Sequence, residues 1–279
     1  MTLPNMRHVA RECVDRAKHL LSLGDEPSVR HACLELRFAI EYLSYDLLQV
    51  YRDEIDFDAV KKWQPKAVIS EMRTVDEYAD KSNALYMGPE VVPGEPAPED
   101  GWRLVGEENR MSMEWANKNY GTLGNFLHAP TIDQLESGKS PTLETLIKRA
   151  NIVLTACEQI LNSRIYNCNF GNFFTFTCGD CGSQMKGRVK DPSKKQVVTC
   201  RNGKCGAIYD ATPGEGERVV LILRKENWVC PPCGTENWIG LHCVKEGNAL
   251  NCAKCGHEMK VDYHLIDKDM RSWPDRTKY

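Results

Sequence analysis

The sequence predicts an α+β protein of several domains, with an N-terminal all-α helical bundle followed by two small β-rich modules. Three observations support this division. Apolar residues recur at helical spacing through the first 165 residues or so, short strand-like runs follow, and ten of the 13 cysteines fall between Cys168 and Cys255. We therefore expect domains at 1–165, 166–215 and 216–279.

The expected helices have recognisable start and stop signals. Gly24 ends the first helix, and Pro27 suits the first turn of the second, which is apolar on almost all sides and so is typical of a central core helix. Residues 88–101 hold four prolines and four acidic residues, so we expect an exposed loop there. The predicted helices cover about 5–22, 27–52, two stretches flanking Pro65, 111–127 and 141–164.

The pattern changes after residue 165. Phenylalanines at 170, 173, 174 and 176 alternate with small or polar residues, which indicates a strand. Further short β runs are Val197–Thr199 and Val219–Leu223. Such short segments cannot build a conventional core, so something other than apolar burial must hold them.

The cysteine spacing indicates what holds them. Two sets share a C-x2-C pair, an 18-residue spacer and a second pair, and they superpose at an offset of 52 residues for three positions and 50 for the fourth. Zinc prefers four such soft ligands in a tetrahedron. The segment from about 170 to 265 resembles tandem zinc ribbons, which implies two structural Zn²⁺ per chain. The expected ligands are Cys178, Cys181, Cys200 and Cys205 for the first site, and Cys230, Cys233, Cys252 and Cys255 for the second.

A glycine follows the second cysteine of every pair, where a positive φ lets backbone N–H groups point at sulfur: Gly182, Gly206, Gly234 and Gly256. Four thiolates close the metal shell, so both zincs are predicted to be structural rather than catalytic. The alternative, disulfides, suits an oxidising compartment. His242, Cys243 and His257 are the other candidate ligands of the second site, and we expect the first two to be packing residues.

The charge is uneven along the chain. Residues 1–165 carry 19 basic and 26 acidic side chains, and residues 166–279 carry 17 and 13. Between Cys178 and Cys205, seven basic residues stand against Asp180 and Asp191, so the first ribbon has an electrostatic case for contacting phosphate, and a solvated loop is the alternative. The second ribbon has no such excess. Trp228 and Trp238 could stack on bases or pack against protein, but we expect them to cover the core of this small ribbon. The predicted nucleic-acid-binding residues are Lys186, Arg188, Lys190, Lys194, Lys195, Arg201 and Lys204.

Polar residues also fall on expected core helices of the bundle. Arg37 and Glu41 lie one turn apart, and Asn125 and His128 share a face near the end of a later helix. Buried polar groups need partners, so we expect the four to face one another.

These two motifs, Arg37-x3-Glu41 and Gly124-Asn125-x2-His128, resemble the HEPN-like helical domains of prokaryotic defence and toxin genes, over residues 5–165. Active members of that group resemble metal-independent ribonucleases. The resemblance implies that His128 is a general acid/base and Asn125 an orienting group. Arg37 could supply a cation from the neighbouring helix, and the candidate catalytic residues are His128, Asn125, Arg37 and Glu41. The arginine that the family places four to six residues before its histidine is missing, since Thr122 and Leu123 stand there.

Two function hypotheses follow. The first is a recognition or adaptor subunit of a bacterial defence-type system that binds nucleic acid, a partner protein or both, with its bundle mediating dimerisation or docking. The second is a HEPN-type ribonuclease whose ribbons deliver RNA to His128. The first residues lack the apolar stretch of a secretory signal and no window is long enough to span a membrane, so we expect a cytoplasmic protein without membrane contact.

Overall fold

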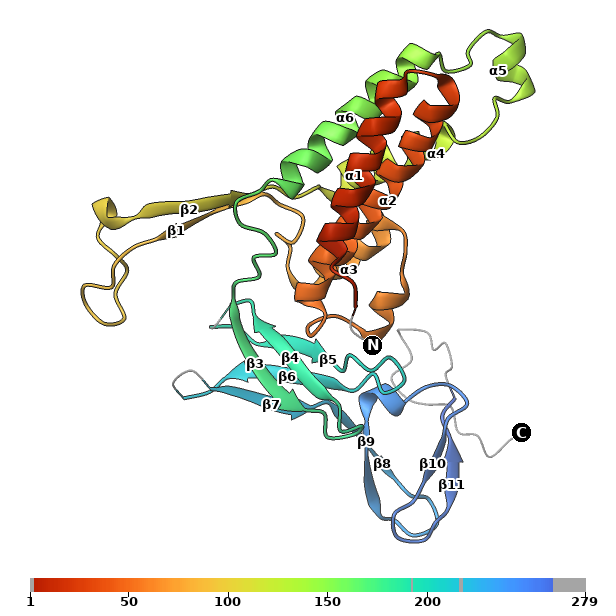
Figure 1. The fold of residues 1–279 in the computed structure, drawn as a ribbon. Coiled ribbons are helices and arrows are strands. Elements are labelled where there is room, and N and C mark those ends of the chain that lie inside the picture. Colours follow the sequence, from red (N-terminus) through yellow and green to blue (C-terminus); the bar gives the residue numbers. More distant parts are fainter. Residues whose placement is uncertain (1–2, 192, 216–217, 263–279) are drawn as a thin grey trace. The chain divides into compact units, whose positions relative to one another are not determined.

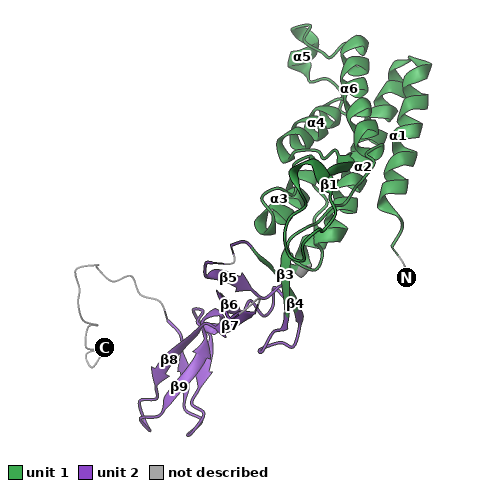
Figure 2. Ribbon diagram, turned by 90° about the vertical axis from the view of Figure 1, so that its left-hand side faces the viewer, with its two compact units in different colours: residues 1–175, 185–189 green, residues 176–184, 190–279 purple. Residues whose placement is uncertain are grey.

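Figure 1 shows the fold of a computed structural model that describes residues 3–191, 193–215 and 218–262. Two compact units emerge, coloured separately in Figure 2. The first comprises residues 1–175 and 185–189, and the second comprises residues 176–184 and 190–279. The α+β class is confirmed, with helices first and small antiparallel sheets after them. The sequence analysis had placed the boundary at residue 165 and treated the two ribbons as separate domains.

The first unit is built on α2, against which four other helices pack. Asp25 caps α2 by accepting a hydrogen bond from the Ser28 amide, and Gly24, at φ 73°, ends α1 as predicted. The first of the two stretches flanking Pro65 is a short 3-10 helix, and the sequence analysis missed α5. The helices are α1 (Met6–Leu23), α2 (Glu26–Tyr51), η1 (Phe57–Lys61), α3 (Pro65–Val75), η2 (Glu99–Gly101), α4 (Met113–Asn125), α5 (Ile132–Glu136) and α6 (Leu143–Leu161).

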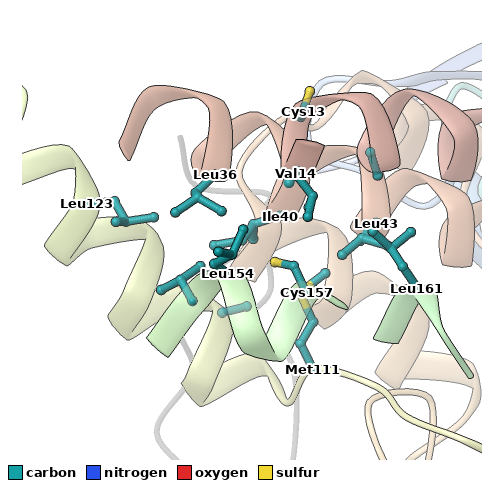
Figure 3. Packing of buried hydrophobic residues seen from close by; sticks show 14 of the residues in the cluster. Cys13, Val14, Leu36, Ile40, Leu43, Met111, Leu123, Leu154, Cys157 and Leu161 are labelled. Atoms are coloured by element: carbon teal, nitrogen blue, oxygen red, sulfur yellow. The ribbon is translucent and has the colours of Figure 1, made fainter. Parts of the chain in front are cut away.

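The core of this unit lies between α1, α2, α4 and α6, as Figure 3 shows. Leu36 and Ile40 of α2 are fully buried there, with Leu123 from α4 and Cys157 from α6. This confirms α2 as the central helix. In the described part of the chain, no helix is both long enough and apolar enough to cross a membrane.

A two-stranded ribbon interrupts the helices, so the expectation of a purely helical first domain is wrong in this detail. Strands β1 (Asn83–Met87) and β2 (Arg103–Glu108) pair antiparallel, with a bulge between Leu85 and Tyr86. They flank the predicted loop, most of whose residues are exposed. Alternation of apolar side chains over β1 is weak, because both faces of this ribbon are largely exposed.

The second unit consists of short antiparallel sheets. The hairpin of β3 and β4 is divided between the units. Residues 176–184 at its tip belong to the second unit, and the rest of both strands belongs to the first. Phe173, Phe174 and Phe176 lie in β3, whereas Phe170 precedes it, and the two predicted β runs both form strands. The strands are β3 (Asn172–Thr177), β4 (Gln184–Val189), the three-stranded sheet of β5 (Gln196–Thr199), β6 (Ile208–Pro213) and β7 (Val219–Leu223), the pair β8 (Lys225–Val229) and β9 (Glu236–Gly240), and the pair β10 (Ala249–Asn251) and β11 (Glu258–Lys260).

Candidate metal centres and a polar cluster in the helical bundle

Each expected cysteine pair lies in a tight turn that a glycine closes. Gly182, Gly206, Gly234 and Gly256 all have φ between 67° and 72°, as predicted. In the three C-x2-C pairs this glycine donates its amide to the carbonyl of the first cysteine, at 2.8–2.9 Å. In the longer Cys200-x4-Cys205 loop, Gly206 bonds to Asn202 instead, because two extra residues shift the turn.

The cysteines converge in the two predicted sets. Facing sulfurs from opposite pairs lie 3.8 Å (Cys178–Cys205) and 3.6 Å (Cys181–Cys200) apart in the first set. In the second set, Cys230 is 3.6 Å from Cys255. A Zn–S bond of about 2.3 Å gives a tetrahedral edge of about 3.8 Å. Both sets therefore fit structural zinc ions with closed shells of four thiolates.

Local hydrogen bonds prepare some of these sulfurs for a metal. The side chain and backbone of Ser183 lower the pKa of Cys181 to about 6, and backbone N–H groups, first that of Cys255, do the same for the pKa of Cys252. Burial raises the pKa of Cys230 to about 12 and also raises that of Cys200. Each set thus contains one cysteine whose lowered pKa favours the thiolate and one whose raised pKa favours the thiol. Metal binding must displace the proton of the second.

Two buried side chains support the sulfurs from outside and were missed by sequence reasoning. The hydroxyl of Tyr209 accepts the Gly179 amide at 2.9 Å and lies 3.3 Å from the Cys178 sulfur. In the second set Asn237 accepts the Ala253 amide at 2.9 Å and donates to the Cys252 sulfur at 3.7 Å. In both cases the amide belongs to the residue after the ligand. The Cys–Gly and Cys–Ala steps gave no sequence signal of this arrangement.

His242 and Cys243 form η3 (Leu241–Cys243) and lie outside the second set of sulfurs. His242 is not a mere packing residue, since its Nε2 lies 2.9 Å from Oδ2 of Asp180 in the first ribbon. His257 contributes its carbonyl to the Cys252 amide at 2.9 Å, and its side chain is exposed.

In the bundle, Arg37 and Glu41 meet on a residue that the sequence analysis did not select. The hydroxyl of Tyr120 donates to Oε1 of Glu41 at 2.6 Å, and the Arg37 guanidinium lies 4.0 Å from the centre of the tyrosine ring. Arg37 also packs against Gly124, where a Cβ would clash with its Nη1. The only signal available was that Tyr120 precedes Gly124 by one helical turn.

Asn125 and His128 do not join this cluster. Both are exposed, and α4 ends at Asn125. Neither side chain forms a hydrogen bond or ion pair with Arg37 or Glu41, all four being in the described part of the chain. Instead, Arg30 donates to the carbonyls of Phe126 and, at 3.4 Å, His128, so a cation caps the end of the helix.

Several of the predicted nucleic-acid-binding residues are engaged in ion pairs. Arg188 lies 3.1 Å from Glu54, a carboxylate 1% exposed, and donates to the carbonyl of Phe170. Lys186 is 3.7 Å from the same glutamate. In the second unit, Lys194 pairs with Asp191 and Lys195 with Asp210, each at 2.8 Å. The backbone amides of Lys190 and Lys204 donate to Gln196 and Asn202 at 3.0 and 3.1 Å, and Arg201 is the seventh residue of the predicted set.

Both ribbons expose apolar side chains on one face. In the three-stranded sheet, Val197, Val220 and Ile222 are 54%, 47% and 58% exposed. Val197 and Ile222 both pair with Asp210 in the sheet register, so Val197, Asp210 and Ile222 lie in a row across the three strands. On the β8–β9 pair, Trp238 is 62% exposed and so does not cover the core.

Comparison with models of known protein families, with curated proteins and with solved structures finds no match to this chain.

Proposed function

We propose that this chain is a non-catalytic adaptor, whose zinc-ribbon unit recognises a partner protein and whose helical unit mediates dimerisation or docking. The setting implied by the HEPN resemblance is a bacterial defence-type system, with the protein acting in the cytoplasm. The alternative partner is nucleic acid, and a separate binding experiment tests for it.

The face of the three-stranded sheet is the observation that carries this proposal. Val197 and Ile222 flank Asp210, which lies 2.8 Å from both Lys195 and Arg224. The aspartate offsets one of these two positive charges and so weakens the attraction of this face for phosphate. An exposed aliphatic face on which Asp210, Lys195 and Arg224 leave one net positive charge suits a protein surface better than a nucleic-acid backbone.

The remaining observations agree with an adaptor. A closed shell of four thiolates leaves no position for a reacting water at either of the two zinc sites. In the bundle, Arg37 and Glu41 are held by Tyr120, and the exposed His128 stands apart from them. A general acid/base acts only within hydrogen-bond reach of groups that share its site.

The test compares affinity capture from the native host with wild-type protein, Ile222→Glu and the matched control Ile132→Glu. Ile132 is 75% exposed on α5, so it carries the same chemical change outside the proposed face. We expect a partner retained by the wild type and the control and lost with Ile222→Glu, with the metal content of all three equal. Capture that is indifferent to Ile222→Glu would contradict the proposal.

Fluorescence anisotropy with labelled RNA and DNA at physiological salt tests the other partner. We expect no binding tighter than about 1 μM, the range of non-specific association. Tight binding that is lost in Lys204→Glu would show that the partner is nucleic acid rather than a protein.

A metal-independent ribonuclease is the second candidate, favoured by the position of Arg30. Its guanidinium at the end of α4 places a cation beside His128, in a chain that lacks the expected upstream arginine. Such a cation could stabilise the charge of a phosphoryl transition state.

Cleavage of labelled structured and single-stranded RNA without added metal decides this candidate. A ribonuclease loses its activity in His128→Ala and keeps it in His31→Ala, which removes an exposed histidine from α2. The adaptor proposal expects no cleavage by any of the three proteins.

A further inference from the structure

We propose that a third divalent metal ion binds in the zinc-ribbon unit, held by Asp180, His242 and the sulfur of Cys205. Cys205 then bridges this ion and the first zinc. One ligand atom from each of the three residues lies within 4.8 Å of the other two. The set joins the first ribbon, which supplies Asp180 and Cys205, to η3 of the second, which supplies His242.

The surroundings of His242 Nε2 carry the argument. Oδ2 of Asp180 lies 2.9 Å from this nitrogen and Sγ of Cys243 lies 3.2 Å from it. As a donor, an Nε2–H group can share its proton between the carboxylate and the sulfur. As an acceptor, the Nε2 lone pair would face an anionic oxygen, and a metal ion between them takes the place of the shared proton. A cation at this point attracts all of these groups.

The histidine is also buried and fixed in position. Its side chain is only 7% exposed, and its Nδ1 is a buried atom without a hydrogen-bond partner among the described residues. Gly240 makes room for the ring, since a Cβ there would overlap with the imidazole. A metal ion at Nε2 leaves Nδ1 as it is, so the support for the site is the burial and the fixed position of the ring.

The donor set indicates the metal. Nitrogen, oxygen and sulfur ligands together suit Zn²⁺, whereas Mg²⁺ and Ca²⁺ require oxygen. The first four-cysteine site carries a charge of −2 with its zinc, which a neighbouring dication compensates. Three protein ligands leave a fourth position open, and the Asp180 side chain is 33% exposed. This site is therefore the one that exchanges with solvent.

The experiment is zinc stoichiometry of the full chain, titrated with free Zn²⁺ and measured by elemental analysis against protein concentration. We expect three zinc ions per chain in the wild type, one of which a chromophoric chelator removes well before the other two. His242→Ala and Asp180→Asn are expected to bind two. His257→Ala, the matched control on an exposed histidine of the same ribbon, is expected to retain three.

Three results would overturn the proposal. A wild-type protein saturated at two zinc ions has no third site. Three ions in His242→Ala would place the third ion elsewhere. A fall to one ion in His242→Ala would mean that the histidine supports the first ribbon structurally and holds no metal of its own.

Discussion

The Arg37 guanidinium packs directly on the backbone of Gly124, filling the space that a side chain would occupy. Gly124→Ala moves the flexible end of this arginine off Tyr120, so we expect the lost cation–π contact to cancel most of the roughly 1 kcal/mol that an added Cβ contributes in a helix, with little net change in the free energy of unfolding. Urea denaturation measures it. Gly121 lies on the same helix with nothing within 4 Å of an added Cβ. Gly121→Ala is therefore expected to stabilise by up to about 1 kcal/mol, and equal effects of the two variants would contradict this contact.

Glu108 and Arg110 form a buried ion pair, with an oxygen–nitrogen distance of 2.8 Å and exposures of 3% and 4%. Arg110→Met leaves an uncompensated carboxyl in the interior. We expect a loss of about 3–5 kcal/mol at neutral pH, and recovery of much of it in the double variant Glu108→Leu/Arg110→Met. Thermal or urea unfolding of the three proteins measures both effects. A single variant as stable as the wild type would contradict a buried pair.

The same pair predicts a steeper pH dependence in the wild type than in the variant. In the wild type, burial favours the neutral carboxyl, but Arg110, Asn83 and the Asn167 amide together outweigh it and lower the pKa of Glu108 below 4.5. Its stabilisation is thus present above about pH 4.5 and lost as pH falls. In Arg110→Met the bonds from Asn83 and Asn167 remain but the largest opposing group is gone, so this pKa rises and the variant should lose less stability than the wild type as pH falls through about 4.5. Unfolding free energies between about pH 3 and 7 check this difference, and parallel curves would refute it.

Tyr209 supports the first zinc site through its hydroxyl. Tyr209→Phe leaves the Gly179 amide without its acceptor and removes the contact with the Cys178 sulfur. We expect a roughly 10- to 100-fold weaker zinc affinity at the first site, the usual effect of losing an outer partner. Competition with a chelator measures it. Tyr78→Phe, an exposed tyrosine of the helical unit, serves as control, and the second site should be unaffected in both.

Three thiols of the helical core are expected to be inert. Burial raises the pKa of Cys13 and Cys33 to about 11 and that of Cys157 to about 12. Near about pH 8 they stay protonated, so native protein should show no alkylation at these positions by peptide mass spectrometry. Because these pKa values exceed the ordinary 9.0, stability should fall as pH rises above about 9. Rapid labelling of any of the three in folded protein would contradict the burial.

Much of the architecture was predictable because its signals are local. The apolar periodicity of α2, the glycine stop at Gly24 and the strand runs each reflect short-range backbone preferences. The zinc ligands could be predicted equally well, since each cysteine pair lies in a turn of a few residues and the two sets repeat at an offset of 52 residues. The hairpin β1–β2 was missed because its strands are exposed on both faces and so lack clear alternation.

The sequence by itself determined the class of the fold, the long helices and all eight ligands of the two four-cysteine sites. Only the tertiary structure decided which polar groups meet. Arg37 contacts Tyr120 rather than His128, and His242 contacts Asp180 across 62 positions of sequence. The physical reason is that a side-chain contact depends on the packing of whole elements, whereas caps, turns and metal knuckles are fixed within a few residues.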